Sequence, residues 1–253
     1  MAEFTEPPQR KELTLRRRGI YLLPNLFTTG VLFSGFYAIV RAMDGLYEQA
    51  AVAVFVALVL DGLDGRIARL TRTQSEFGAQ YDSLADMVAF GAAPALIMYE
   101  WALQPMGRIG WIAAFIHCAA VALRLARFNT NIGVVDKRYF QGLPSPSGAA
   151  LVAGFVWIAL DLGYAEVTQP LRVLAAIVTV FAGVTMVSSV PFYSFKTVNF
   201  RRAVPFSVVL LPVLAFAVVS YQPAAVLAAV FIGYSLSGYL LWLWNFRKKR
   251  SPF

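Results

Sequence analysis

The sequence predicts an all-α polytopic membrane bundle of about eight transmembrane helices, with both termini in the cytoplasm. Three observations support this class. Hydrophobic residues make up 58% of the 253 positions, and the mean hydropathy is +0.62. Charged residues make up only 14%, well below the ~25% typical of soluble domains. Finally, the apolar runs recur at about the 20-residue length that crosses the hydrocarbon layer.

The elements follow in chain order within one integral membrane domain, residues 1–253. A basic segment, 1–18, comes first, and we expect it at the cytoplasmic surface against anionic headgroups; the same charges are equally typical of a plain topology signal. The first apolar run lacks a cleavage site and is expected to be a signal anchor. The predicted spans are 20–40, 46–66, 80–103, 108–128, 146–164, 170–190, 204–220 and 223–245. A turn at Tyr221-Gln222-Pro223 joins the last two.

The distribution of basic residues supports this number of spans. With the N-terminus inside, all of the 22 Lys and Arg residues except Arg41, Arg108 and Arg172 fall on the cytoplasmic side. Cytoplasmic loops accumulate these residues, so the net charge of +8 needs no nucleic acid as a partner. We expect a bacterial inner-membrane protein in contact with lipid, with its functional site facing the cytoplasm.

The chain has a single histidine, His117, and a single cysteine, Cys118. With no second cysteine, an intrachain disulfide is excluded, and one histidine supplies neither a histidine pair for zinc nor a convincing Ser-His-Asp triad. Both residues lie in an apolar run, where we interpret them as packed helix residues. Zinc and serine-hydrolase chemistry are therefore disfavoured.

Four aspartates are placed at the adjoining ends of two predicted spans. Asp61 and Asp64 end the second span, and Asp82 and Asp86 begin the third. Ionisable groups in a membrane cost about 2.5–3.5 kcal/mol each on insertion scales, so four at one depth indicate function. The four-residue step from Gly78 to Asp82 and Asp86 keeps these positions on one helical face. Two such faces from neighbouring helices can converge.

Converging carboxylates predict a divalent cation site. Four close carboxylates cannot all stay ionised without cations, and hard oxygen ligands favour Mg²⁺, Mn²⁺ or Ca²⁺. Two divalent ions would balance four negative charges, so we expect two Mg²⁺ or Mn²⁺ per site, suited to clamping a pyrophosphate. Arg69, in phase with Asp61, would offset substrate charge, and Gly65 and Gly78 would let phosphate oxygens approach the backbone. The alternative is that these carboxylates only pair with local arginines at the membrane interface.

These residues resemble the CDP-alcohol phosphatidyltransferase signature, D-x-x-D-G-x-x-A-R, eight residues, G-x-x-x-D-x-x-x-D. Every fixed position is matched from Asp61 to Asp86. The resemblance implies a six-helix catalytic core, residues 20–190, and two further C-terminal helices, 204–245, that shield the core or form a homodimer contact. It also implies that Asp61, Asp64 and Asp82 are metal ligands and that Asp86 lies near the second metal as general base. The residues implied around the CDP-lipid are Gly65, Ala68, Arg69 and Gly78. Asn25, in the segment Pro24-Asn25-Leu26, is implied there as well.

The acceptor alcohol is predicted from two other segments. Arg124 and Arg127 share a helical face and could grip a carboxylate or phosphate with forked hydrogen bonds. Asn129 adds a donor and an acceptor, and a stiff turn made by Gly142, Pro144 and Pro146 would hold Ser145 over the pocket. The residues alone are equally consistent with a topology signal followed by a helix-entry turn.

The segments R-L-A-R-F-N and F-x-G-L-P-S-P resemble the membrane-type phosphatidylserine synthases. This resemblance implies CDP-diacylglycerol as donor and L-serine as acceptor, with Arg124, Arg127, Asn129 and Ser145 as the acceptor-binding residues. Glycerol phosphate, inositol phosphate and choline remain alternative acceptors for the same chemistry, although choline has no carboxylate for an arginine to bind. A more remote alternative is an ion-binding transporter, which would place its carboxylates at the membrane midplane. A structural membrane protein would not need the cluster.

Overall fold

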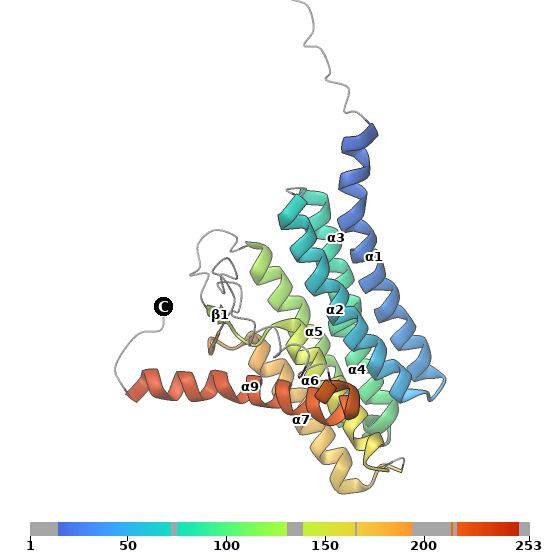
Figure 1. The fold of residues 1–253 in the computed structure, drawn as a ribbon. Helices are drawn as coiled ribbons and strands as arrows, with labels where there is room; N and C mark the ends of the chain where they lie inside the picture. Colours follow the sequence, from blue (N-terminus) through green and yellow to red (C-terminus); the bar gives the residue numbers. More distant parts are fainter. Residues whose placement is uncertain are drawn as a thin grey trace, which may run out of the picture.

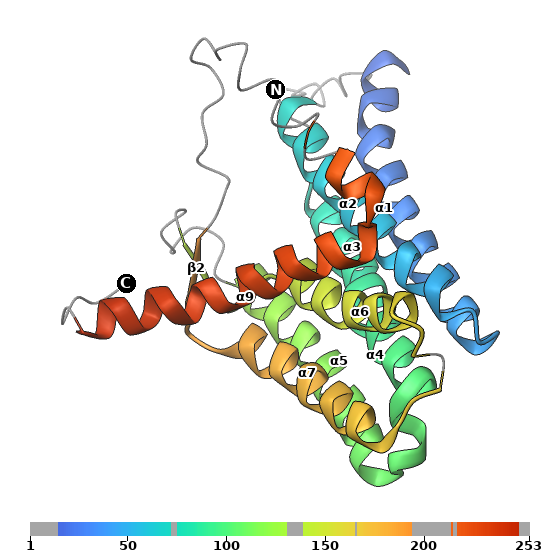
Figure 2. The same ribbon diagram turned by 60° about the horizontal axis from the view of Figure 1, so that its bottom comes forward.

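The computed structural model describes residues 15–71, 75–130, 139–164, 166–193, 214 and 217–247; within these ranges, the side chains of residues 15–24, Ala68, Arg69, Thr71, Tyr139 and 245–247 are not described. The long helices are α1 (Leu15–Met43), α2 (Tyr47–Thr71), α3 (Glu76–Asp86), α5 (Arg108–Thr130), α6 (Ser145–Asp161), α7 (Gln169–Val187) and α9 (Pro223–Arg247). In Figures 1 and 2, α1, α2 and α3 lie side by side, α5 packs against α7, and α9 crosses the bundle.

The first two helices form a tight hairpin. At the end of α1, Leu46 N–H donates to Arg41 and Gly45 N–H to Ala42, the two bonds of a Schellman motif. Gly45 has a φ of +75°, which glycine adopts without steric cost. The contact surface consists of small side chains, with Ala38 fully buried on α1 and Ala50, Ala53, Ala57 and Val54 buried on α2. This close packing sets α2, and with it the aspartates, against α1.

The predicted third span is one long helix with two π-helical segments. It runs through α3, η1 (Met87–Ala92, π-helical), α4 (Ala93–Met98) and η2 (Tyr99–Leu103, π-helical), and ends in the short η3 (Gln104–Met106). The backbone stays in the right-handed helical region at each junction. The first π-helical segment begins directly after Asp86. Because π-helical segments shift the helical register and are frequent at functional sites, this one changes the register between Asp86 and the rest of the helix.

A short β-ribbon departs from the all-α prediction. Strands β1 (Tyr139–Gln141) and β2 (Pro191–Tyr193) pair antiparallel, with Phe140 opposite Phe192. Gly142, with a φ of +77°, follows β1, and a Cβ there would lie 2.9 Å from the Ser188 carbonyl oxygen. The ribbon joins the entry of α6 to the exit of α7, two points that are distant in the chain.

The helical bounds agree with six predicted spans to within a few residues at most ends, and α9 matches the eighth. Four helices are long and apolar enough to cross a membrane by length and composition: Asn25–Met43, Arg108–Thr130, Gln169–Val187 and Pro223–Trp244. Most of the predicted seventh span, 204–220, lies outside the described residues. The chain bends at Gln222, where the sequence predicts a turn. The mostly helical fold is confirmed and is consistent with a membrane protein, while eight spans and cytoplasmic termini stay predictions.

Candidate active site

The site forms where α2 and α3 bring three carboxylates together. Asp61 from α2 and Asp82 and Asp86 from α3 each offer a carboxylate oxygen, and these oxygens all lie within 4.8 Å of one another. Asp82 and Asp86 share a face because they are four residues apart. Asp86 is 8% exposed, while Asp61 and Asp82 are half-buried. The convergence predicted from the spacing is therefore present for three of the four aspartates.

Asp64, the fourth aspartate, points toward α1. It is 5% exposed, and its Oδ2 accepts a hydrogen bond from the Thr28 hydroxyl. It still interacts electrostatically with Asp82 and Asp86. The structure thus places Asp64 beside the three-carboxylate group and outside it, and its role as a metal ligand stays a prediction.

The donor set fits a divalent cation. Asp86 Oδ1 is buried and has no hydrogen-bond partner among the described residues, which is costly for a carboxylate oxygen unless a cation or proton meets it. At an effective dielectric constant of 20, two charges 4.8 Å apart repel by about 3.5 kcal/mol. Three carboxylate oxygens, with no histidine or cysteine among them, match the preference of Mg²⁺ or Mn²⁺.

The start of α3 forms the adjoining side of the site. Ser75 caps this helix by accepting a hydrogen bond of 3.0 Å from Gly78 N–H. A Cβ at Gly78 would lie 3.1 Å from Ser75 Oγ and 3.7 Å from Asn25 Oδ1. The structure therefore brings together Asn25 and Gly78, which the sequence assigns to one CDP pocket. Gly65 is half-buried on α2, whereas the side chains of Ala68 and Arg69 lie outside the described part, so their predicted roles are not tested.

The four predicted acceptor residues have different surroundings. Arg124 Nη1 donates to Ser145 Oγ over 3.2 Å, and Ser145 is only 1% exposed. Arg124 also interacts electrostatically with Asp86. Arg127 instead donates to the carbonyl oxygen of Val187 at the end of α7, and Asn129 Nδ2 donates to Ser83 Oγ on α3 over 3.0 Å. Only Arg124 and Ser145 form a pair.

Several residues near the site escaped sequence reasoning. Ser83 ties α3 to α5 through Asn129, and Tyr81 shares a 3.0 Å hydrogen bond with Thr29 of α1. His117 is fully buried, with Nε2 3.1 Å from the carbonyl oxygen of Phe90 inside η1. That contact gives a partner to a carbonyl of the π-helical segment after Asp86. Spacing from the aspartates would have located Ser83 and Tyr81, but nothing local in the sequence indicates the Phe90 contact.

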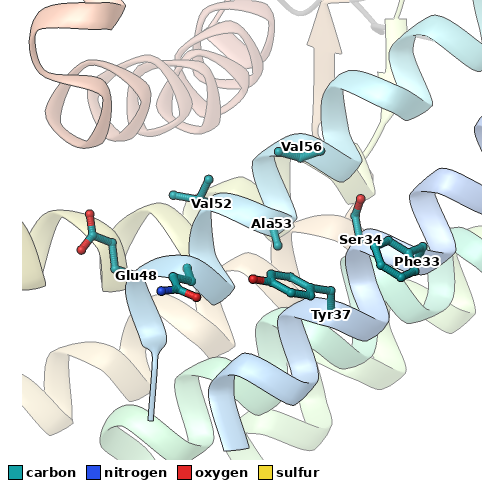
Figure 3. Close-up of a pocket in the computed structure, with 8 residues that line it drawn as sticks. Phe33, Ser34, Tyr37, Glu48, Val52, Ala53 and Val56 are labelled. Carbon is teal, nitrogen blue, oxygen red and sulfur yellow. The ribbon is translucent and has the colours of Figure 1, made fainter. Parts of the chain in front are cut away.

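A surface groove between α1 and α2 has no aspartate in its lining. A groove of about 410 Å³ between α1 and α2 is lined by Phe33, Ser34, Tyr37, Glu48, Gln49, Val52, Ala53 and Val56. Figure 3 shows Tyr37 of α1 pointing toward the α2 side of this groove. Glu48 begins α2, roughly 20 Å along the helix from Asp61 at 1.5 Å per residue. The groove therefore follows the first half of α2, from Glu48 to Val56, before the part of the helix that carries Asp61.

Comparisons with known proteins agree with the chemistry of the site. Residues 21–186 match the family model for CDP-alcohol phosphatidyltransferase. A CDP-diacylglycerol–serine O-phosphatidyltransferase from Helicobacter pylori is 38% identical over 225 residues, which cover 88% of this chain and 92% of that protein. The protein of the same name from Methanocaldococcus jannaschii is 43% identical over 102 residues, 40% of this chain and 47% of its own.

A solved structure is similar at a greater distance. The crystal structure of Mycobacterium tuberculosis phosphatidylinositol phosphate synthase with CDP-DAG bound aligns with a TM-score of 0.48 and 20% identity, over 75% of this chain and 95% of that chain. That likeness is too distant to carry an argument. The family model covers most of the chain, and it includes both aspartate-bearing helices. The resemblance found in the sequence is confirmed, and the chain belongs to the CDP-alcohol phosphatidyltransferase family.

Proposed function

We propose that this enzyme transfers the phosphatidyl group of CDP-diacylglycerol to the hydroxyl of L-serine and releases CMP. The observation that carries the proposal is the position of the Arg124–Ser145 pair beside the three-carboxylate group. The three-carboxylate group suits a pyrophosphate with divalent cations, and the Arg124–Ser145 pair suits a small polar acceptor. The relatives described above bear the name of this activity.

The surroundings of Arg124 and Arg127 favour serine over a phosphorylated acceptor. Arg127 donates to the Val187 carbonyl oxygen, whereas Arg124 is the one of these two that interacts electrostatically with Asp86. One guanidinium matches the single carboxylate of serine through a forked hydrogen bond. A phosphate dianion would be better served by both arginines. Glycerol phosphate, inositol phosphate and choline are the acceptors that the experiment below compares.

In this mechanism, Arg124 and Ser145 hold serine with its hydroxyl toward Asp86. Asp86 accepts the hydroxyl proton, and the serine oxygen forms a bond to the lipid-side phosphorus as the bond to CMP breaks. CMP leaves with that electron pair, and Asp86 later gives its proton to solvent. When bound, two Mg²⁺ or Mn²⁺ at Asp61, Asp64, Asp82 and Asp86 would supply charge stabilisation for the pyrophosphate. The protein itself contributes positioning and electrostatics.

The location of the site is part of the proposal. The basic residues assigned to cytoplasmic loops favour a bacterial inner-membrane enzyme whose carboxylates face the cytoplasm, where serine and CMP are soluble. CDP-diacylglycerol would enter from the inner leaflet with its acyl chains in lipid. Asn25 and Gly78 would then lie near the cytidine diphosphate, together with Gly65, Ala68 and Arg69.

The test is CMP release by the purified enzyme with CDP-diacylglycerol, Mn²⁺ or Mg²⁺, and serine, glycerol phosphate, inositol phosphate or choline in turn. We expect serine alone to support turnover. Replacement Arg124→Gln should raise the KM for serine by about tenfold or more, since a charge-assisted hydrogen bond is lost. Arg108→Gln, at the exposed start of α5, is the matched control. Release that depends on another acceptor would overturn the serine assignment and leave the family intact.

A further inference from the structure

Helix α9 lies beyond residues 21–186, the part of the chain that matches the family model. It packs on α6 and on strand β2, and it crosses the bundle in both ribbon views (Figures 1 and 2). We propose that α9 positions Arg124 and Ser145 through the β1–β2 ribbon. This inference rests on the proposed function, because it gives α9 a part in binding the acceptor.

The first link is a direct contact between the α9 backbone and the ribbon. Gly238 faces the ring of Phe192 in β2, and a Cβ at Gly238 would lie 2.7 Å from Phe192 Cδ1 and closer to two further ring atoms. Phe192 is fully buried, and its ring also packs on Tyr234 with centroids 5.6 Å apart. The ring cannot move freely, so only glycine at position 238 lets β2 lie against α9 in this way.

Hydroxyl groups supply the second link. Tyr234 donates to the carbonyl oxygen of Tyr193 in β2 over 3.1 Å. Tyr239 shares a 2.7 Å hydrogen bond with the hydroxyl of Thr185 near the end of α7, and its ring stacks on Phe181 at 5.7 Å. α9 is thus joined both to the ribbon and to the end of α7.

The third link leads from these contacts to the acceptor residues. Thr185, whose hydroxyl meets α9, accepts a hydrogen bond of 3.1 Å at its carbonyl oxygen from Leu143 N–H. Gly142 N–H donates to Val190 over 2.9 Å just before β2. Leu143 is fully buried and stands two residues before Ser145, the partner of Arg124. A shift of the ribbon would therefore move Ser145.

The links are confined to the acceptor side of the site. None of the described contacts from Gly238, Tyr239 or Thr185 reaches the three aspartates. On the same helix, Tyr234 interacts electrostatically with Arg124. Loosening α9 should consequently impair serine binding more than binding of the CDP-lipid.

The kinetic test compares two alanine substitutions on the same helix. Gly238→Ala forces a Cβ into the Phe192 ring, whereas Gly233→Ala adds a Cβ with nothing within 4 Å. Both substitutions raise the helix propensity of α9 equally, so a difference in KM between the two variants reports on the contact with Phe192. We expect Gly238→Ala to raise the KM for serine by about tenfold and to change the KM for CDP-diacylglycerol by less than about twofold. Gly233→Ala should match the parent enzyme in both.

Two less disruptive substitutions test the proposal if Gly238→Ala fails to fold. Tyr239→Phe removes only the hydroxyl that meets Thr185, and Tyr221→Phe alters a tyrosine that is 86% exposed. Tyr239→Phe should raise the KM for serine about threefold, and Tyr221→Phe should leave it unchanged. Equal effects on both substrates in the Gly238 and Tyr239 variants would overturn the proposal.

A labelling test reports on the pocket without any turnover. The chain has one cysteine, so Cys118→Ala with Ser145→Cys provides a single thiol at the acceptor loop. At 1% exposure for Ser145, maleimide should react slowly, and Gly238→Ala should accelerate it about tenfold while Gly233→Ala does not. Faster labelling of the Gly238→Ala variant, together with no serine-dependent CMP release by the parent enzyme, would refute the serine assignment and support the positioning. Unchanged labelling in the Gly238 variant would overturn the positioning itself.

Discussion

Replacing Asp82 with Asn should stabilise the metal-free protein and destabilise the metal-bound one. Asp82 shares the three-carboxylate group with Asp61 and Asp86, whose oxygens lie within 4.8 Å. Each pair repels by about 3.5 kcal/mol at an effective dielectric constant of 20, and Asp82 takes part in two of the three pairs. The fully ionised group therefore loses about 7 kcal/mol of repulsion in the variant.

The measurable gain is smaller because proton uptake already relieves part of the repulsion. A net gain of about 2 kcal/mol would raise the unfolding midpoint in EDTA by about 4–8 °C for a chain of this size. With added Mn²⁺, the parent protein should instead be more stable than the variant. At 100 times its dissociation constant, the ion stabilises the parent protein by about 2.7 kcal/mol, and a variant without one ligand loses most of that gain.

The assay is thermal unfolding of the detergent-solubilised protein, followed by intrinsic fluorescence in EDTA and in a Mn²⁺ series. Asp161→Asn, at the exposed end of α6, removes a carboxylate of the same kind outside the group and should move neither midpoint. An Asp82 variant that melts earlier in EDTA, or that keeps the full response to Mn²⁺, would refute the electrostatic reasoning.

Three further outcomes follow from single contacts. Thr28→Val removes the donor to buried Asp64 and should lower the unfolding free energy by about 1–3 kcal/mol. Thr28→Ser keeps a hydroxyl donor and should retain most of the parent's unfolding free energy. His117→Phe leaves the Phe90 carbonyl oxygen without that partner and should lower both the unfolding midpoint and kcat, because η1 directly follows Asp86; an unchanged kcat would contradict this. Chelation should abolish CMP release, and Mn²⁺ should restore it; turnover that survives complete chelation would remove the metal from the mechanism.

Local spacing predicted the parts of the site that a helix period controls. Asp82 and Asp86 share a face because their side chains recur every four residues, and the short connection between α2 and α3 limits how far Asp61 can lie from them. The bounds of the long helices were predictable for a related reason, since an apolar run of about 20 residues has few alternatives in a membrane.

Hydrogen-bond partners from distant elements were not predictable. Asp64 carries the same local signal as Asp61, yet it binds the Thr28 hydroxyl, 36 residues away. Arg127 shares a helical face with Arg124, yet it caps α7 at Val187, 60 residues away. Periodicity places each of these side chains on a face of its own helix, but it says nothing about what that face meets.

The sequence by itself determined a membrane-embedded helical chain, a carboxylate motif for divalent cations and the family to which the chain belongs. These depend on composition and on spacing within one or two helices. Only the tertiary structure decided that three aspartates converge while Asp64 turns to α1, that a π-helical segment follows Asp86, and that Gly238 meets Phe192. The physical reason is that such contacts join chain segments whose relative placement is set by the packing of the whole bundle.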